Sequence, residues 1–203
     1  MIALVDYGAG NLTSVKKALG AVGAEVFIPE RPEELADANG VIVPGVGHFG
    51  ATRALGPAWT AGILDRVSEG RPLLGICLGM HWLFESSDEA PELTGLGVLP
   101  GACVRLGSAV PLPAGLKVPH VGWNSLVIER ESWIADGVPE GAQVYFTHSY
   151  VAPVTGDAIA LTEHGAPFAA IVQRGQVAGL QFHPEKSGDV GLRILRNFVE
   201  MAG

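Results

Sequence analysis

The first 95 residues alternate between short apolar segments and segments whose apolar residues recur with a helical spacing. The short segments predict buried strands, and the spaced segments predict helices with one apolar face. A strand, a helix and a second strand in succession form a right-handed unit whose two strands are parallel. We therefore expect an α/β fold, in which an open, mostly parallel sheet has helices on both faces.

Residues that start or stop regular structure set the limits of these elements. Asn11 can cap the first helix, whose inward residues include Val15 and Leu19, and Gly23 ends it. Three more helices and four strands are expected in this half of the chain. The helices are expected at Pro32–Ala38, Pro57–Ser68 and Leu78–Glu85, and the strands at Ile2–Asp6, Glu25–Ile28, Val41–Pro44 and Leu73–Cys77.

After Gly95 the pattern changes to short apolar or alternating segments between glycine and proline turns, which predicts added, partly antiparallel strands. A last amphipathic helix is expected over Asp189–Met201, with Ser187 as its cap. No repeat or linker interrupts the chain, so residues 1–203 are expected to form one domain. The added strands are expected at Gly97–Leu99, Cys103–Leu106, Leu126–Glu129, Gln143–Thr147, Ile159–Leu161, Phe168–Gln173 and Val177–Phe182.

Composition argues against several classes of function. Of the 203 residues, 48% are hydrophobic and 17% are charged, which supports a sizeable core. The net charge of −8 argues against nucleic acid and anionic membranes as partners. No apolar segment is long enough to span a membrane, and no basic leader opens the chain, so a cytoplasmic protein is expected. The two cysteines, Cys77 and Cys103, lack metal-binding spacing, so neither a metal nor a cofactor is expected.

Cys77 lies between Gly75 and Gly79, after a predicted strand and before a predicted helix. The active groups of an open parallel sheet gather at the carboxyl ends of its strands. The flanking glycines allow neighbouring backbone to approach closely, as a tight nucleophile turn requires. The N-terminus of the following helix favours the thiolate, and the amide of Leu78 can donate to an oxyanion.

A second oxyanion donor is expected from the segment Gly45-Val46-Gly47, which follows the third predicted strand. These residues have little side-chain bulk to block a substrate, and main-chain amides such as that of Val46 can point into the site. Donors of this kind stabilise the charge that develops in a tetrahedral intermediate.

His183 and Glu185 flank Pro184, directly after the last predicted strand. Proline favours an extended conformation in the residue before it, and in extended chain the residues i and i+2 lie on one face. Glu185 is therefore expected beside the His183 ring, where a carboxylate fixes the tautomer and stabilises the imidazolium. Together with the thiol of Cys77, these groups can form a nucleophilic triad.

Each of these motifs also has a plain structural interpretation. A lone cysteine between glycines is usually a small buried residue, and His-Pro-Glu is often a polar turn. Their position at corresponding strand ends of one sheet makes this interpretation difficult for the two motifs together. The residues for which a structural or solvated role is favoured are Cys103, His48, His120, His148 and His164.

With these motifs the sequence resembles the triad glutamine amidotransferases over essentially its whole length. More narrowly, it is similar to the glutaminase subunits of imidazole glycerol phosphate synthase. The general resemblance rests on Pro44–Gly47, Gly75–Met80 and His183–Glu185, and the narrower one on Asp6–Leu12, Pro119–Asn124 and Thr147–Tyr150.

The resemblance implies that Cys77 attacks the side-chain amide of glutamine, His183 gives a proton to the leaving ammonia, and Glu185 orients His183. Water then releases glutamate from the thioester. Ammonia passes to a separate cyclase subunit of barrel fold, which forms imidazole glycerol phosphate in histidine synthesis. The substrate-binding positions implied are Gly47, Glu89, His148, Ser149 and Tyr150, and the positions expected to face the partner are Asn11, His120, Trp123 and Asn124.

One position departs from the family pattern. Relatives usually have glutamine four residues after the nucleophile, where this chain has His81. On a helix that begins at Leu78, position 81 lies near the nucleophile. His81 is therefore expected to face the substrate, with an imidazole in place of an amide as the hydrogen-bonding group.

Three other functions stay open at this point. A glutaminase that feeds another synthase, such as the pyridoxal-phosphate one, would keep the triad but lack Pro119–Asn124 in this form. A stand-alone cysteine hydrolase would act without an ammonia acceptor. A non-enzymatic binding module is disfavoured by the intact Cys77, His183 and Glu185. For Trp123, the alternative to a partner contact is a core position in a turn.

Overall fold

The computed structural model describes all residues, 1–203, around a central eight-stranded sheet in the order β2-β1-β3-β4-β13-β12-β11-β8. Its parallel part consists of β2 (Val26–Phe27), β1 (Ile2–Leu4), β3 (Gly40–Val43), β4 (Leu73–Ile76) and β13 (Val177–Leu180). Its antiparallel part consists of β12 (Pro167–Arg174), β11 (Ala158–Glu163) and β8 (Val127–Ile128). The expected fold class is confirmed.

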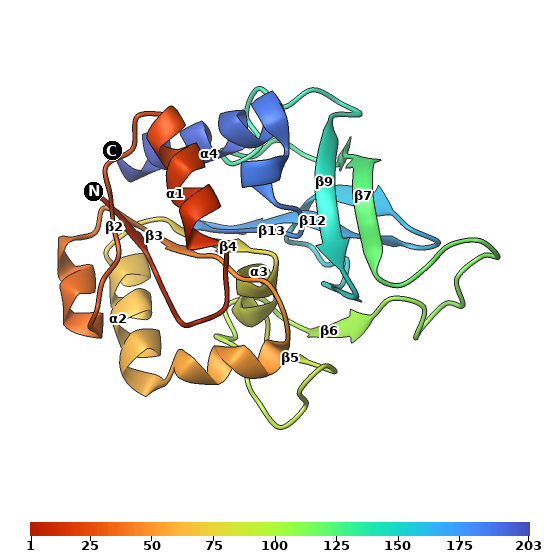
Figure 1. Cartoon of the computed structure of the whole chain (residues 1–203), viewed down its shortest axis with the longest axis horizontal. Helices are drawn as coiled ribbons and strands as arrows, with labels where there is room; N and C mark the ends of the chain where they lie inside the picture. The colour runs from red at the N-terminus through yellow and green to blue at the C-terminus, as the bar shows by residue number, and fades with distance from the viewer.

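Helices cover both faces of this sheet (Figure 1). The helices α1 (Leu12–Ala21) and α4 (Gly188–Ala202) lie on one face, and α2 (Pro57–Ser68) and α3 (Leu78–Leu83) lie on the other. Successive strand residues point to opposite faces, so Ile42 joins the core under α1 and α4, whereas Val41 and Val43 join the core under α2 and α3. Short 3-10 helices lie at Pro32–Asp37, Phe49–Ala54 and Pro184–Lys186.

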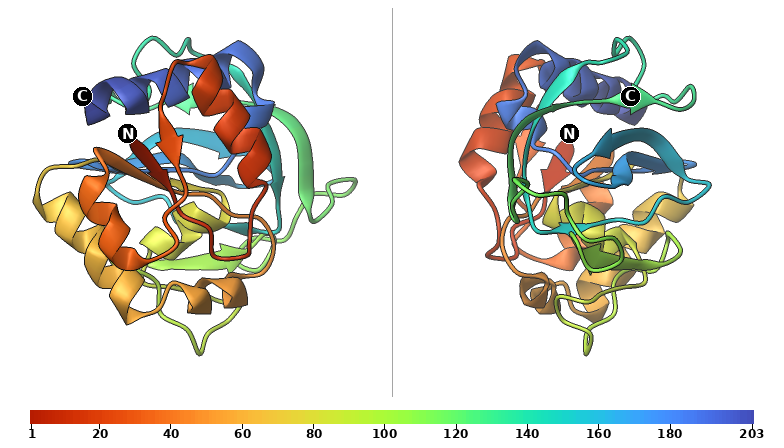
Figure 2. Two further views of the ribbon diagram at one scale, coloured as in Figure 1. Left: turned by 60° about the vertical axis from the view of Figure 1, so that its left-hand side comes forward. Right: turned by 90° about the vertical axis from the view of Figure 1, so that its right-hand side faces the viewer.

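Two smaller sheets come from the second half of the chain. One pairs β7 (His120–Ser125) with β9 (Gln143–His148), and it stands beside the main sheet in Figure 1. The other orders β10 (Tyr150–Val151), β6 (Ala102–Arg105) and β5 (Ser86–Ser87). The segment between β6 and β7 projects from the rest of the molecule (Figure 2). No helix has both the length and the apolar character that crossing a membrane requires.

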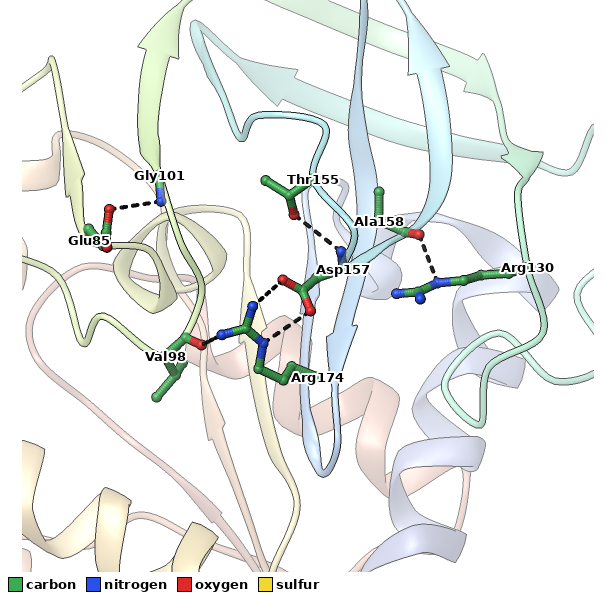
Figure 3. Close-up of polar contacts among 8 residues, drawn as sticks. All are labelled: Glu85, Val98, Gly101, Arg130, Thr155, Asp157, Ala158 and Arg174. Atoms are coloured by element: carbon green, nitrogen blue, oxygen red, sulfur yellow. Dashed lines mark hydrogen bonds and ion pairs between the residues drawn. The ribbon is translucent and has the colours of Figure 1, made fainter.

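The prediction of a strand at Gly97–Leu99 is wrong. This segment pairs with no strand: the amides of Gly97 and Leu99 donate to the carbonyls of Phe84 and Leu83, at 3.2 and 3.0 Å. In addition, Arg174 Nη1 donates to the carbonyl of Val98 at 2.8 Å (Figure 3). The same guanidinium binds both carboxylate oxygens of Asp157, at 3.1 and 2.6 Å. The planar fork of arginine suits this arrangement, and it ties the segment to the end of β12.

Three further predictions need correction. The helix expected to run to Glu85 ends at Leu83, because the amide of Glu85 instead donates to the carbonyl of Gly101 at 3.1 Å. The turn considered around Trp123 is instead strand β7, since residues 120–125 all pair with β9. Ser187 is the N-cap residue of α4 as expected, but its side chain makes no capping hydrogen bond, because its hydroxyl donates to the carbonyl of His183 at 2.7 Å. The cap at Asn11 is confirmed: its side chain accepts the amide of Ser14 at 3.3 Å.

Candidate active site

Cys77 lies on the turn between β4 and α3, with a φ of +51° that makes it the one non-glycine residue with positive φ. The residues two positions before and after it, Gly75 and Gly79, have no room for a side chain. A Cβ on Gly79 would collide with the carbonyl oxygen of Val43, and one on Gly75 would lie 2.5 Å from the carbonyl oxygen of Gly79. Strained backbone of this kind is typical of functional turns. The close packing of α3 on the sheet therefore fixes where the thiol points.

Three contacts from other elements surround Cys77, which is 6% exposed. Its amide donates to the carbonyl of Leu180 at 2.7 Å, which joins the ends of β4 and β13. Its Sγ lies 4.0 Å from the carbonyl oxygen of Thr147 on β9 and 3.9 Å from Nε2 of Gln181. The thiol therefore lies where the main sheet meets the β7–β9 pair.

His183 and Glu185 form a buried pair, with Nδ1 and Oε1 2.9 Å apart and both side chains 2% exposed. The expected contact is present, although the chain is not extended through Pro184 as predicted. His183 is extended, but Pro184–Lys186 turns as a 3-10 helix. The amide of His183 donates to the carbonyl of Tyr145 at 2.9 Å, so β9 also holds this segment.

The surroundings of His183 favour its charged form. Burial alone would lower its pKa, but the Cys77 side chain and the Glu185 carboxylate together raise the pKa to about 9. Nε2 is the ring nitrogen away from Glu185, and it is buried without a hydrogen bond of ordinary geometry. That nitrogen is thus free to exchange a proton with a reacting group.

A cavity of about 280 Å³ opens beside Cys77, and it brings together all six residues expected to bind substrate. Glu89 accepts the amide of Phe49 at 2.7 Å through Oε2, which fixes its carboxylate at the cavity wall. A larger hollow of about 800 Å³, between residues 128–138 and α4, contains no cysteine or histidine. The residues that line the cavity beside Cys77 are Gly47, Cys77, Leu78, His81, Glu89, Pro119, Thr147, His148, Ser149 and Tyr150.

The histidines of β7 and β9 form a hydrogen-bonded chain. His148 Nδ1 donates to the carbonyl of Tyr150 at 2.9 Å, so its Nε2 accepts from His120 Nδ1 at 3.0 Å. Burial lowers the pKa of His148 well below its usual value, and burial together with His164 lowers that of His120 to about 4. Both rings are therefore neutral near pH 7.

The main-chain groups expected to form the oxyanion hole are not all free. The amide of Leu78 donates to the carbonyl of Gly45 at 3.4 Å, a long hydrogen bond. Gly45 is enclosed by the Tyr7 hydroxyl and by Leu78, whereas Gly47 has a φ of +102° and no heavy atom within 4 Å of where a Cβ would lie. The Gly45-Val46-Gly47 segment is therefore fixed at one end and unobstructed at the other.

The four residues expected to face a partner differ in exposure. Trp123 is 56% exposed, which excludes the core alternative, and its ring packs edge-on against Tyr145. Asn11 is also exposed, and Asn124 is half-buried, with its side chain donating to the carbonyl of Glu163 at 2.9 Å. His120 is 4% exposed, so its side chain offers no surface to a partner, contrary to the prediction. It stacks on Phe146 and His164 instead.

Sequence reasoning missed Gln181, a fully buried polar residue beside the nucleophile. Its Oε1 lies 2.8 Å from Nε2 of His81, and its Nε2 faces Cys77. The alternation of a strand could have revealed it, because residues i and i+2 share a face and Gln181 lies two before His183. No group of three or more His, Cys, Asp or Glu side chains is placed to hold a metal ion.

Comparisons with known proteins agree with this geometry. Residues 3–202 match the family model "Glutamine amidotransferase class-I". The chain is similar to proteins named imidazole glycerol phosphate synthase subunit HisH. It is 47% identical to that of Shouchella clausii and 41% identical to that of Methanothermobacter thermautotrophicus, in each case over 99% of this chain and 98% of the relative. A crystal structure of a glutamine amidotransferase superposes with a TM-score of 0.76 at 25% identity, over 100% of both chains.

Proposed function

The chain belongs to the class-I glutamine amidotransferases, which hydrolyse glutamine, and we propose that it is the glutaminase subunit of an imidazole glycerol phosphate synthase, with Cys77, His183 and Glu185 as its triad. The observation that carries the proposal is the position of Cys77 at a cavity of about 280 Å³, beside a His183 that pairs with Glu185 at 2.9 Å. The HisH relatives support a place in histidine biosynthesis, and hence in the cytoplasm.

In the first half of the reaction, the Cys77 thiolate attacks the side-chain amide carbon of glutamine. The tetrahedral intermediate then collapses, and the carbon–nitrogen bond breaks. The leaving nitrogen takes a proton from Nε2 of His183 and departs as ammonia, which leaves a γ-glutamyl thioester on Cys77. Because the pKa of His183 is about 9, the ring carries this proton at neutral pH.

In the second half, His183 is neutral and acts as the base. It takes a proton from water as the water oxygen attacks the thioester carbon. The carbon–sulfur bond breaks, and the thiolate and the imidazolium are restored. The new γ-carboxylic acid gives its remaining proton to solvent and leaves as glutamate. Glu185 holds Nδ1 throughout, so the same nitrogen, Nε2, serves both proton transfers.

The cavity wall suits an amino acid. Glu89 uses one carboxylate oxygen for the amide of Phe49, and its other oxygen can accept from the α-ammonium group of glutamine. Ser149 and Tyr150 offer hydroxyl and main-chain groups. His81 and His148 line the cavity with neutral rings, and because both nitrogens of His148 are already bonded, that ring contributes surface and no hydrogen bond. Gly47 leaves room for the substrate beside the nucleophile.

Formation of the oxyanion hole is the proposed point of control. The amides of Val46 and Leu78 would receive the oxyanion, but the Leu78 amide already donates to Gly45. Rotation of the Gly45-Val46-Gly47 backbone would release it, and glycine tolerates both signs of φ. We assign this rotation to the binding of a barrel-fold cyclase subunit and its ligand, which receives the ammonia. The proposed contact surface consists of the exposed side of β7, with Val121 and Trp123, together with Asn11 and Asn124.

Purification of the chain with its natural partner, followed by glutamate-release assays, tests this proposal. The partner is expected to be the cyclase subunit, and glutamate release is expected to rise from the chain alone to the complex and again when the cyclase ligand is added. A pyridoxal-phosphate synthase as partner would assign the chain to another pathway. Equal rates in all three states would remove the control by the partner and favour a stand-alone hydrolase.

A further inference from the structure

Gln181 lies between two residues of the site, and neither the triad nor the substrate contacts account for it. It is fully buried, its Oε1 lies 2.8 Å from His81 Nε2, and its Nε2 lies 3.9 Å from Cys77 Sγ. Sulfur accepts hydrogen bonds at longer distances than oxygen, so the second contact is an N–H···S interaction. The three side chains thus form a line from α3 through the end of β13 to the nucleophile.

We propose that His81 and Gln181 are positioning residues for the nucleophile: His81 holds the Gln181 amide so that its N–H points at Cys77 and stabilises the thiolate. This inference rests on the proposed function, because it assigns a task to residues around the same thiol. It gives the departure from the family pattern at position 81 a chemical role that does not require contact with substrate.

Hydrogen bonds fix the main chain around Gln181, so the orientation of its side-chain amide is the one feature left to be decided. Leu180 pairs with Ile76, and the Cys77 amide donates to the Leu180 carbonyl at 2.7 Å. The main-chain N–H of Gln181 donates to the carbonyl of Ala170 at 2.9 Å. The backbone on both sides of the N–H···S contact is therefore fixed. Only a half-turn of the terminal amide remains, and that half-turn would exchange the N–H for the oxygen beside the sulfur.

His81 decides that choice through its own hydrogen bond. With a proton on Nε2, the ring requires an acceptor, so Gln181 presents Oε1 to His81 and its N–H to Cys77. The opposite orientation would place the lone pairs of Oε1 against the sulfur and disfavour the thiolate. His81 is itself buried, which lowers its pKa, so the ring adds no positive charge of its own to the site.

Other titratable groups face Cys77 from neighbouring elements and stay in place in the variants below. His183 approaches from the segment after β13, and Tyr7 from the loop after β1. The neutral His148 and the carboxylate of Glu89 lie around the cavity, and Glu185 pairs with His183. A shift in the ionisation of the Cys77 thiol after a change at Gln181 is therefore due to the loss of the Gln181 side-chain amide.

The test is the pH dependence of Cys77 alkylation by iodoacetamide in the isolated chain, read by mass spectrometry of the Cys77 peptide. Gln181→Met keeps the size of the side chain but removes the N–H donor. It is expected to raise the pH at which alkylation reaches half its maximal rate, the midpoint, by about one pH unit. Gln181→Glu places a carboxylate there and is expected to raise it further. Gln173→Met is the matched control on β12, away from the site, and is expected to leave the midpoint unchanged.

Variants at position 81 test the orienting role. His81→Phe removes the donor to Gln181 and is expected to raise the midpoint by a smaller amount, whereas His81→Gln restores a donor and is expected to return it toward the wild-type value. In glutamine hydrolysis, Gln181→Met should lower kcat by about tenfold with KM within about threefold, as expected for a lost thiolate contact.

An alkylation midpoint that is unchanged in Gln181→Met overturns the inference. If the midpoint shifts in Gln181→Met but is unchanged in His81→Phe, the orienting role of His81 is overturned, and with it the inference. Alkylation requires neither glutamine nor a partner, so this result is independent of the proposed function. A chain that hydrolyses glutamine normally with no shift in midpoint would contradict the positioning role alone. A midpoint shift in Gln181→Met, together with a wild-type complex that does not hydrolyse glutamine, would contradict the proposed function alone.

Discussion

His183 and His148 are both buried, and they belong to two different regions around the same thiol. His183 follows a strand of the main sheet and pairs with a carboxylate, whereas His148 ends a strand of the β7–β9 sheet and pairs with a carbonyl and a second histidine. The pKa of His183 is raised to about 9, and that of His148 is lowered well below its usual value. Depth of burial is therefore a poor guide to the charge of a histidine, and its partners decide.

The difference separates two tasks. A charged histidine can deliver a proton to leaving ammonia, and it needs the carboxylate that keeps it charged. The neutral His148 has both ring nitrogens bonded, to Tyr150 and His120, so its ring forms a fixed wall of the cavity without adding charge. The main sheet supplies the proposed reacting groups, and the β7–β9 sheet supplies the uncharged wall and the exposed face proposed for the partner.

The largest expected effect comes from removing the charged histidine. His183→Ala should lower glutamine hydrolysis by about 10³-fold, within the range for loss of a general acid and base. Cyclisation driven by free ammonium in the complex should survive, because the proposed function places the acceptor site on the partner. Steady-state assays with glutamine measure hydrolysis, and assays with ammonium measure cyclisation. Loss of both activities would show that the substitution damaged the complex and not the chemistry alone.

Glu185→Gln should have a smaller effect, since the imidazole remains but loses its charged partner. Glutamine hydrolysis should fall by about ten- to a hundredfold. The alkaline limb of the rate profile should also move to lower pH, because the carboxylate contributes to raising the pKa of His183 to about 9. Rate measurements from neutral pH to above pH 9 show the limb. If the rate still falls only near pH 9 in Glu185→Gln, the titration of a group other than His183 causes that fall.

The two regions should also respond to pH with opposite signs in stability. The folded pKa of His183 is raised, so its contribution is complete below pH 6.5 and is lost as the pH rises toward 9. The folded pKa of His120 is lowered to about 4, so stability is lost as the pH falls from 6.5 toward 4. The slope is about 1.4 kcal/mol per pH unit at most for each proton.

Urea unfolding of the wild type, His183→Phe and His120→Phe at several pH values measures these slopes. His120→Phe should lose less stability on acidification than the wild type, and His183→Phe should lose less on raising the pH. Equal slopes in all three proteins would contradict the assigned charge states.

The smallest effect on the chain itself is expected from Trp123→Ala. Its ring is 56% exposed, so the free energy of unfolding should change by less than about 1 kcal/mol. In the complex, ammonia should leak, and glutamate formed should exceed imidazole product. A thermal melt of the chain and the product ratio of the complex check the two parts. An unchanged one-to-one ratio at normal affinity would remove Trp123 from the interface.

The sequence predicted the parallel half of the fold well, because its strands and helices are set by local periodicity and by residues such as Asn11 and Gly23. The second half depends on distant pairing. Strand β7 includes a proline-flanked, glycine-containing segment that resembles a turn until β9 pairs with it. The stretch Gly97–Leu99 has a strand-like composition but pairs with no strand, because the carbonyls of Leu83 and Phe84 and the side chain of Arg174 hold it.

The candidate site shows the same division. Cys77, His183 and Glu185 could be named because each lies beside a strand end with a distinctive local motif. The burial of His120 depends on Phe146 and His164, which lie far from it in sequence. Gln181 belongs to no conspicuous motif of its own, and its contacts with His81 and Cys77 exist only because β4 and β13 are neighbours.

The central claim is that Cys77 attacks glutamine, and detection of the thioester tests it most directly. The complex is mixed with glutamine, quenched in acid and digested, and the peptides are analysed by mass spectrometry. The account predicts a γ-glutamyl group on the Cys77 peptide, none on the Cys103 peptide, and none anywhere in Cys77→Ala, which should be folded but inactive. Continued glutamate release by Cys77→Ala within a few-fold of the wild type, or a glutamyl group on another residue, would contradict it.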